Sequence, residues 1–246
     1  MKFELEVIAF DILSCQLAEE NGADRIELCA NPHEGGTTPS YGMMKAARKS
    51  TQIQVFPIIR PRGGDFLYTQ EEFEAMKEDI KAAQDIGCEG VVIGILNKNG
   101  DIDVEKCQEL AEIAKGIDVT FHRAFDRVKD PQSSLEQIIG IGCKRILSSG
   151  LMPTAIEGSS LLKELVLQAD GRIKIMPGSG IRSGNIVQLA NATGACCFHS
   201  SARKTLNSQM HYLNNDMQES LVQVSLDGTE VNKLKNNLVT YFHSTH

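Results

Sequence analysis

The sequence lacks the features that mark several easily recognised classes of protein. Its net charge is -7 and it has no run of lysine and arginine, which argues against nucleic acid as a partner, because a phosphate backbone is held mainly by clustered basic side chains. No apolar stretch approaches the ~20 residues of a membrane span. The first residues, MKFELEVIAFD, alternate charged and apolar side chains, unlike a signal peptide. We therefore expect a cytoplasmic protein with no membrane partner.

Cysteine is present, but without the spacing of a disulfide or zinc framework. The seven cysteines include no C-x-x-C pair, and an odd, scattered set suits a reducing compartment. Cys196 and Cys197 are adjacent, so on a strand their side chains would face opposite ways. This favours two small core residues over a metal or redox pair.

No linker rich in proline, glycine or serine divides the chain, so we predict one domain over residues 1–246. Short β-rich runs alternate with segments of helical periodicity. The eight strand candidates are residues 3–9, 25–30, 55–61, 90–96, 119–125, 145–150, 173–180 and 196–202. This alternation predicts an α/β fold with a parallel sheet, and eight units close into a (β/α)8 barrel of the TIM type. The competing doubly wound sheet lacks its G-x-G-x-x-G turn after the first strand, where the chain reads AFDILS.

Helix boundaries and a weak repeat support this count. Thr69 and Glu72 have the spacing of a capping box, and Thr154 and Glu157 repeat it. Asp130–Pro131 predicts another helix start. A glycine recurs before every second strand, at Gly22, Gly87, Gly142 and Gly194.

One segment does not fit a simple barrel. Residues 204–228 separate the last strand from the final helix candidate, 229–242. Connections in α/β units usually have about 2–6 residues. This long connection is either an active-site lid or an interface segment, and an interface segment would make the protein a homodimer.

Strand alternation separates the side chains that face the helices from those that face the barrel interior. The helix-facing set should be the more apolar, which turns the charged strand residues inward. The lower ones, Glu4, Arg25, Arg145 and Lys174, are expected to form a structural salt-bridge layer. The upper ones lie at the carboxyl ends of their strands, where barrel enzymes have their sites; they are Glu6, Glu27, Cys29, Arg60, His122 and His199.

The stretch VTFHRAFD, residues 119–126, carries His122 to this mouth. An imidazole titrates near neutral pH, and Glu27 is the expected carboxylate to orient it as a general acid or base. Arg123 and Asp126 form either a loop ion pair or a ligand contact.

Two loops favour an anionic ligand. Gly178, Ser179 and Gly180 precede a helix, so we expect free backbone N–H groups and a helix N-terminus to converge there. The segment 199–203 adds hydroxyl groups and a guanidinium, and the loops after strands seven and eight are the customary phosphate site of this fold. The loop RPRGGDF, residues 60–66, supplies further guanidinium groups.

These residues also resemble a known family. RIELC with EGGTTPSYG, RPRGGDFLY, VTFHRAFD, SSG with AIEG, MPGSGI and FHSSAR are similar to motifs of the copper homeostasis CutC family, from Glu6 to about Arg203. The resemblance implies a cytoplasmic TIM-type barrel linked to copper tolerance and copper binding. Relatives often carry a cysteine at the end of the first strand; this chain lacks it, so a two-thiolate Cu(I) site would keep only Cys29.

The predicted function is that of the family, and an enzyme is the alternative. The family resemblance implies a copper-homeostasis protein that binds Cu(I) through Cys29. The mouth chemistry predicts instead a lyase or isomerase acting on a small phosphorylated or carboxylated metabolite, with Glu27, His122 and Glu6 as acid–base residues. The expected ligand-binding residues are Arg60, Arg62, Asp65, Arg123, Asp126, Ser149, Gly150, Gly178, Ser179, Gly180, His199, Ser200 and Ser201.

Overall fold

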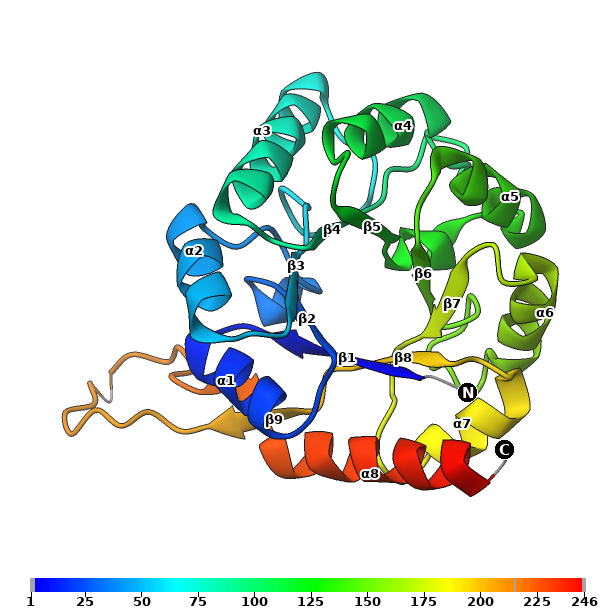
Figure 1. Cartoon of the computed structure of the whole chain (residues 1–246). Helices are drawn as coiled ribbons and strands as arrows, with labels where there is room; N and C mark the ends of the chain where they lie inside the picture. Colours follow the sequence, from blue (N-terminus) through cyan, green and yellow to red (C-terminus); the bar gives the residue numbers. More distant parts are fainter. Residues whose placement is uncertain (1–2, 215, 245–246) are drawn as a thin grey trace.

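Eight parallel strands close into a ring in the computed structural model, which describes residues 3–214 and 216–244 (Figure 1). They are β1 (Glu4–Ala9), β2 (Arg25–Leu28), β3 (Gln54–Pro57), β4 (Gly90–Ile93), β5 (Asp118–Phe121), β6 (Arg145–Ser148), β7 (Lys174–Pro177) and β8 (Cys197–Ser200). Hydrogen bonds give the orders β3-β2-β1-β8 and β4-β5-β6-β7. A parallel bridge between Ile58 and Val92 joins the two halves, and β7 lies beside β8. The predicted (β/α)8 barrel is confirmed.

Helices surround the ring. The α-helices are α1 (Ile12–Glu20), α2 (Tyr41–Ser50), α3 (Gln70–Ile86), α4 (Val104–Ile113), α5 (Pro131–Ile141), α6 (Ser159–Ala169), α7 (Ile186–Thr193) and α8 (Gly228–Ser244), and the short 3-10 helices are η1 (Pro32–Glu34) and η2 (Arg123–Arg127). Within the described ranges, none is long and apolar enough to cross a membrane.

The helix ends follow the chemistry read from the sequence, with one difference. Thr69 and Glu72 form both bonds of the capping box, and Asp130 caps α5 by accepting from the Ser133 N–H. Thr154 and Glu157 also bond each other reciprocally, but α6 begins later, at Ser159. This second box closes a turn in the loop before the helix, where Gly150 and Gly158 also approach each other closely.

The charged lower layer of the barrel interior is present as predicted. Glu4 accepts from Arg25 at 3.2 Å and lies 3.7 Å from Arg145, and it also pairs with Lys174. The guanidinium groups of Arg25 and Arg145 lie over the ring of Phe56, at 5.2 and 5.3 Å from its centroid. Opposed charges and an aromatic surface thus compensate the loss of water around these groups.

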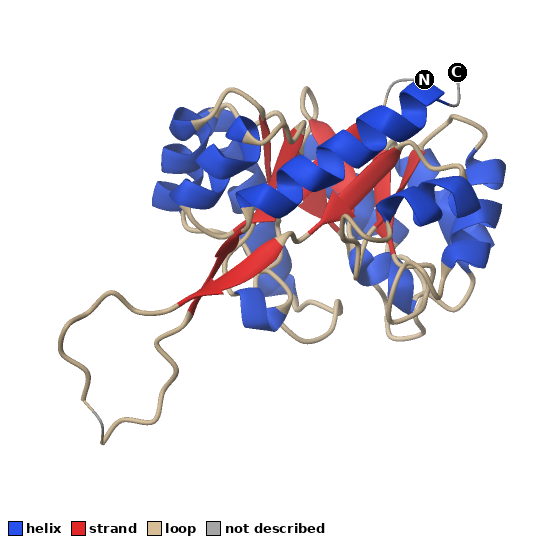
Figure 2. Ribbon diagram, turned by 90° about the horizontal axis from the view of Figure 1, so that it is seen from below, coloured by secondary structure: helices blue, strands red, loops and turns tan. Residues whose placement is uncertain are grey.

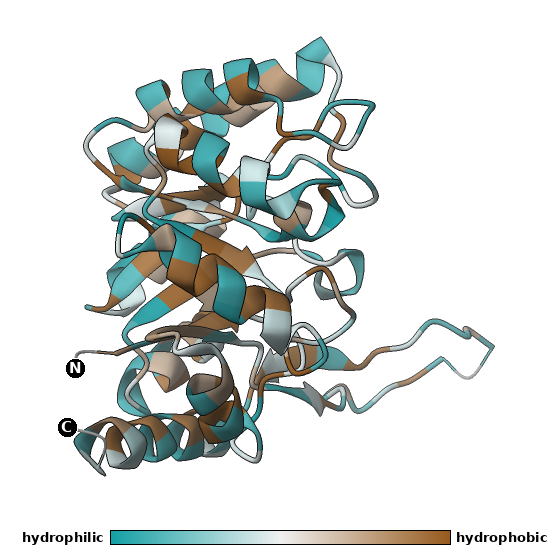
Figure 3. Cartoon of the chain, turned by 90° about the vertical axis from the view of Figure 1, so that its right-hand side faces the viewer, coloured by the Kyte–Doolittle hydropathy of each residue, from teal (hydrophilic) through white to brown (hydrophobic). Residues whose placement is uncertain are grey.

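The long connection forms an arm. β9 (Arg203–Leu206) pairs antiparallel with β10 (Gln223–Leu226), and the chain between them loops outward (Figure 2). Figure 3 shows the arm standing clear of the barrel, with apolar and polar residues mixed along it. Among the described residues beyond Arg203, none lines either of the two cavities at the mouth, so this arm does not cover them as a lid would.

Candidate functional site

A buried charge cluster lies where β8, β1 and β2 run side by side. The register places Glu6 opposite Arg25 on β2 and opposite His199 on β8. Arg25 Nε donates to Glu6 Oε2 at 2.5 Å, and His199 Nδ1 lies 2.7 Å from Glu6 Oε1. Burial disfavours the charged carboxylate, but Arg25 and His199 outweigh it and lower the pKa of Glu6 to about 2. Glu6 is therefore an ionised anchor that orients His199.

Glu27 differs from Glu6 in having no fixed partner. It is 4% exposed, forms no hydrogen bond within the described chain, and lies 3.7 Å from His199 Nε2. Burial raises its pKa to about 7. For His199, burial lowers the pKa, but the Glu6 hydrogen bond and the charges of Glu27 and Glu6 outweigh it, so the net shift is upward. A carboxyl group and an imidazole whose pKa values are both raised thus lie side by side.

His122 lies at the end of β5, but it is not the titrating group that the sequence predicts. Burial, with the nearby Arg60 charge, lowers its pKa to about 3. No hydrogen bond or ion pair joins it to Glu27, whose nearest ionisable partner is His199. The expectation that Glu27 orients His122 is therefore wrong for this structure. The two side chains come from different strands, and only the closed ring determines which imidazole faces Glu27.

Arg60 joins two mouth loops. Its guanidinium donates to the carbonyl oxygens of Glu34, Gly36 and Gly64 at 2.8 to 2.9 Å, and its Nε is buried without a partner. Arg62 is held farther out, by Glu72 and Asp65. Arg60 and Asp65 line a cavity, whereas Arg62 lines neither.

Asp126 organises the loop that follows β6. Its carboxylate accepts from the Ser148 hydroxyl at 2.6 Å, from the backbone and hydroxyl of Ser149 at 2.9 Å, and from Arg123 Nε at 2.7 Å. The Leu151 N–H is a further donor at 3.3 Å. The structure therefore contains the ion pair of Arg123 and Asp126.

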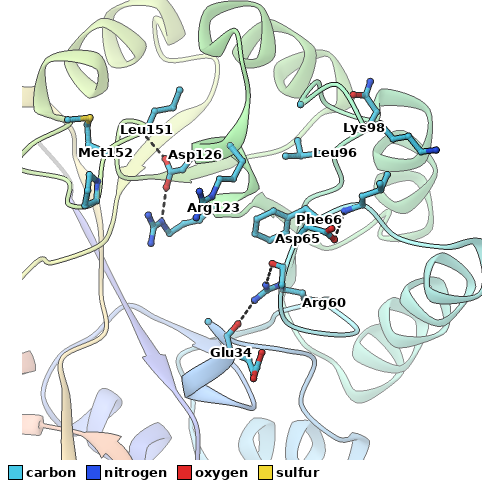
Figure 4. A pocket seen from close by; sticks show the side chains of 17 residues that line it. Glu34, Arg60, Asp65, Phe66, Leu96, Lys98, Arg123, Asp126, Leu151 and Met152 are labelled. Atoms are coloured by element: carbon cyan, nitrogen blue, oxygen red, sulfur yellow. Dashed lines mark hydrogen bonds and ion pairs between the residues drawn. The ribbon is translucent and has the colours of Figure 1, made fainter.

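Two adjoining cavities open at the mouth. The inner cavity, of about 250 Å³, is lined by Glu27, His122, His199 and thirteen other residues. Four of these, Gly35, Arg60, Phe66 and Arg123, also line the outer cavity. The outer cavity, of about 1080 Å³, lies among the loops after β2 to β6. Figure 4 shows Arg60, Phe66, Arg123 and Asp126 around it.

The predicted anion loops meet at the inner cavity. Ser179, Gly180, His199, Ser201 and Arg203 all line it. The remaining predicted members serve the fold: Gly178 N–H donates to Ser148 O, and the Ser200 hydroxyl donates to Ile181 O. Ser149 and Gly150 lie in the loop that Asp126 holds.

The helix N-terminus does not converge there as expected. α7 begins only at Ile186, and the N–H and hydroxyl of Ser183 before it bond the Glu230 carboxylate from α8. A side chain of the protein itself thus takes the acceptor role that an anion would have at this helix start.

Comparison with known proteins agrees with the motifs and the fold. The model of the CutC family matches residues 3–204. The chain belongs to the CutC family. A family protein CutC from Chromobacterium violaceum is 50% identical, over 85% of this chain and 84% of that protein. The human copper homeostasis protein cutC homolog is 46% identical, over 95% of this chain and 87% of that protein.

Solved structures show the same fold. The crystal structure of CutC from Streptococcus agalactiae has a TM-score of 0.78 and 35% identity, and the match covers 81% of this chain and 98% of that one. Thiamine phosphate pyrophosphorylase from Pyrococcus furiosus matches with a TM-score of 0.61 at 16% identity, over 97% and 96% of the two chains, and shows the barrel architecture alone.

Because relatives are named copper homeostasis proteins, we asked which side chains of this CutC chain could bind a metal ion. In residues 3–214 and 216–244, one set of three such side chains comes within reach of a single ion: ligand atoms of Glu6, Glu27 and His199 lie within 4.8 Å of one another. Both Glu6 oxygens and His199 Nδ1 are already bonded, which leaves Glu27 and His199 Nε2. Oxygen and imidazole donors also do not match the thiolate preference of Cu(I).

Cys29, the thiol that the CutC resemblance pointed to, is buried. It packs with Phe56, Ile58 and Val92, and burial raises its pKa well above the ordinary value. No second cysteine belongs to this cluster in the part of the chain that the structure describes. A single protonated thiol in apolar surroundings does not fit Cu(I).

Sequence reasoning missed most of the outer cavity. Its lining includes residues from loops that follow β3 to β6: Phe66, Leu96, Lys98, Arg127, Leu151 and Met152. Their position just after strand carboxyl ends was a usable signal in this CutC chain. The four apolar residues were overlooked because they carry no chemistry of their own, and Lys98 and Arg127 because they lie outside the motifs that the sequence reasoning followed.

Proposed function

We propose that this CutC-family protein is an enzyme that performs acid–base chemistry on a small phosphorylated or carboxylated metabolite. The observation that carries the proposal is Glu27, a carboxyl group without a hydrogen bond that faces the inner cavity, with its pKa raised by burial to about 7. A group in this range changes protonation state readily at the pH of the cell.

The inner cavity supplies the other requirements of such an enzyme. Ser201 and Arg203 line it, with a hydroxyl group and a guanidinium that suit an anion, whereas the Ser179 hydroxyl donates to Pro153 O. His199, oriented by Glu6 through its Nδ1, places Nε2 toward Glu27. In this proposal Glu27 accepts a proton from the substrate, and the His199 ring delivers or takes up the second proton.

The experiment is a conversion assay on a mixture of small phosphorylated and carboxylated metabolites, followed by NMR. Glu27→Gln and His199→Gln should each lower the rate by about 10²–10⁴-fold. The exposed Glu74→Gln serves as the matched control and should leave it unchanged. The wild-type rate should rise with pH through about 7, as Glu27 loses its proton. Equal rates in all four proteins would contradict the proposal.

Direct Cu(I) binding is the competing function, suggested by the name that relatives such as the human protein carry. Because Cys29 is a lone buried thiol, we expect that the protein does not remove Cu(I) from a competing chelator. Equilibrium competition with wild type and Cys29→Ser tests this. Retention of one Cu(I) by wild type, and its loss in the variant, would favour copper binding over the enzyme.

We also propose that the arm joins two copies of the chain, in the cytoplasm. Six large apolar side chains on the arm are exposed, among them Tyr212 at 75% and Met210 at 63%. The others are Leu213, Met217, Leu221 and Val222. Apolar residues on a projecting two-stranded ribbon favour burial against another protein surface.

The seven cysteines are all unpaired, which suits a reducing compartment such as the cytoplasm.

A further inference from the structure

The imidazole of His122 is fixed in one tautomer. Its Nδ1 accepts a hydrogen bond from the backbone N–H of Ala124 at 3.2 Å, so Nδ1 carries no proton and the neutral ring is protonated at Nε2. The Cε1 and Nδ1 edge lies against Gly94 of the β4 loop, where a Cβ atom would come within 2.4 Å of the ring. Glycine at this position lets the ring lie in this orientation.

The opposite edge of the ring has no partner. His122 Nε2 is buried and forms no hydrogen bond to any residue that the structure describes. Phe66 packs on the ring at 4.9 Å between centroids, and the ring lines the inner cavity together with Glu27. An unpaired buried donor is rare in folded proteins because water has been lost without replacement. A ligand oxygen in the cavity would supply the missing acceptor.

The surroundings favour a developing negative charge there. Burial and the charge of Arg60 hold the pKa of His122 at about 3, so the ring stays a neutral donor throughout the physiological range. Arg60 has its own unpartnered Nε and also lines the cavity. A fixed N–H beside a buried cation stabilises an oxyanion more than a neutral carbonyl.

We propose that His122 donates a hydrogen bond to a carbonyl oxygen of the substrate, and that the reaction begins by enolisation of an aldehyde or ketone that carries a phosphate or carboxylate group. This inference rests on the proposed function, because Glu27 is the base. A carboxylate base and a neutral imidazole donor that line one cavity are suited to removing a proton next to a carbonyl group.

The step is balanced without any further reactant. Glu27 takes the proton from the carbon next to the carbonyl group, and the C–H electron pair becomes the carbon–carbon double bond. The carbonyl π pair moves to oxygen, where the resulting enolate accepts the hydrogen bond from His122 Nε2. When the carbon that lost the proton carries a hydroxyl group, Glu27 returns its proton to the former carbonyl carbon. The hydroxyl proton passes to the enolate oxygen through the His199 ring, and the hydroxyl oxygen becomes the new carbonyl oxygen, which completes an isomerisation.

Two probes of equal length test the inference. 2-Phosphoglycolate presents planar oxygen atoms where an enolate oxygen would lie, and 2-hydroxyethyl phosphate replaces them with an alcohol. Calorimetry at pH 6 gives the ratio of their dissociation constants. In His122→Phe, which keeps a ring beside Phe66 but lacks the N–H, the preference for 2-phosphoglycolate should fall at least tenfold, while 2-hydroxyethyl phosphate binds as before. The exposed His243→Phe is the matched control.

The outcomes separate the two proposals. An unchanged preference in His122→Phe would overturn the donor role and leave the anion site standing. Failure of both probes to bind wild type would overturn the proposed anion site and the enolisation with it. Should His122→Phe not fold, ¹⁵N spectra of the wild-type histidines still decide: His122 must remain the Nε2–H tautomer from pH 5.5 to 8.5, and titration in that range would refute the inference.

Discussion

Among individual residues, the consequences of burying a charge depend on whether a partner is fixed to it. Arg25 and Glu6 are both 1% exposed and bond each other directly, so each compensates the other for lost water. Glu27 is almost as deeply buried but has no such partner, and its proton stays bound to a higher pH. Two carboxyl groups in one barrel interior thus have pKa values shifted in opposite directions, that of Glu6 downward and that of Glu27 upward.

Removing one partner of this buried ion pair should destabilise the protein far more than removing one partner of an exposed ion pair. Arg25→Met leaves the Glu6 carboxylate without its cation and should lower the free energy of unfolding by about 3–5 kcal/mol. Arg172→Met removes one partner of an exposed pair with Glu136 and should cause a much smaller loss, because water screens that pair. Urea unfolding of both variants at pH 7 measures the difference. Equal losses would show that burial does not determine the strength of these pairs.

Glu27 predicts a pH dependence of stability with a defined sign. Its pKa in the folded protein is raised from 4.5 to about 7, so folding is favoured while the group is protonated, and this contribution is lost as pH rises from 4.5 through about 7. At 1.36 kcal/mol per pH unit the loss is about 3 kcal/mol. Glu27→Gln should escape it, so the stability of the variant relative to wild type should increase by that order between pH 4.5 and 8.

Urea unfolding of wild type and Glu27→Gln at these two pH values measures the change. A constant difference between the two proteins would mean that Glu27 is ionised throughout, and it would remove the basis for its role as a proton acceptor near neutral pH.

At the scale of elements, one short helix determines the shape of a neighbouring loop. η2 follows β5 and presents Asp126, whose carboxylate collects donors from Ser148, Ser149 and Leu151 after β6. Leu151 adopts a left-handed backbone conformation with a φ of 61°, which residues other than glycine rarely adopt. The bonds to Asp126 hold the loop in this form, and the loop in turn provides one wall of the outer cavity.

Asp126→Asn should therefore destabilise the protein by about 2–4 kcal/mol, because an amide replaces one acceptor oxygen with a donor that faces other N–H and O–H groups. Asp65→Asn, in an exposed loop pair with Arg62, is the control and should have little effect. Thermal unfolding checks stability. Amide hydrogen exchange over residues 148–152 should increase in the first variant alone; unchanged exchange there would contradict this account.

On the scale of the whole molecule, the barrel and the arm are built on different principles. The barrel buries its apolar residues between strands and helices, whereas the arm consists of two short paired strands and an exposed loop. A two-stranded ribbon with exposed apolar side chains is at best marginally stable alone. The arm therefore points to an additional contact outside the barrel.

Replacing residues 207–222 by Asn-Gly, which joins Leu206 to Gln223 through a tight turn, should leave the barrel folded and convert a dimer into a monomer. Analytical ultracentrifugation measures the mass, and circular dichroism checks the fold. A wild-type monomer, or a variant that stays dimeric, would show that the arm does not join two copies.

Much of this architecture could be read from the chain. Alternating strand and helix segments, the capping residues of α3 and α5, and strand parity predicted the barrel and the inward direction of Glu4, Arg25, Arg145 and Lys174. These are local properties, because periodicity and caps depend on neighbours within a few residues. Of the predicted site, the same reasoning placed Glu27, His122, His199 and Ser179 at one end of the strands, and they line one cavity.

The sequence by itself determined the fold and the set of side chains at the mouth, but not how they pair. Only the closed ring put His199 rather than His122 beside Glu27, brought Arg25 to Glu6, and directed Arg60 to loop carbonyl groups. It also brought the Glu230 carboxylate to the Ser183 N–H, just before α7. Partners and pKa values depend on distances between segments far apart in the chain and on the water that packing removes, and neither quantity is encoded in the spacing of residues along a strand.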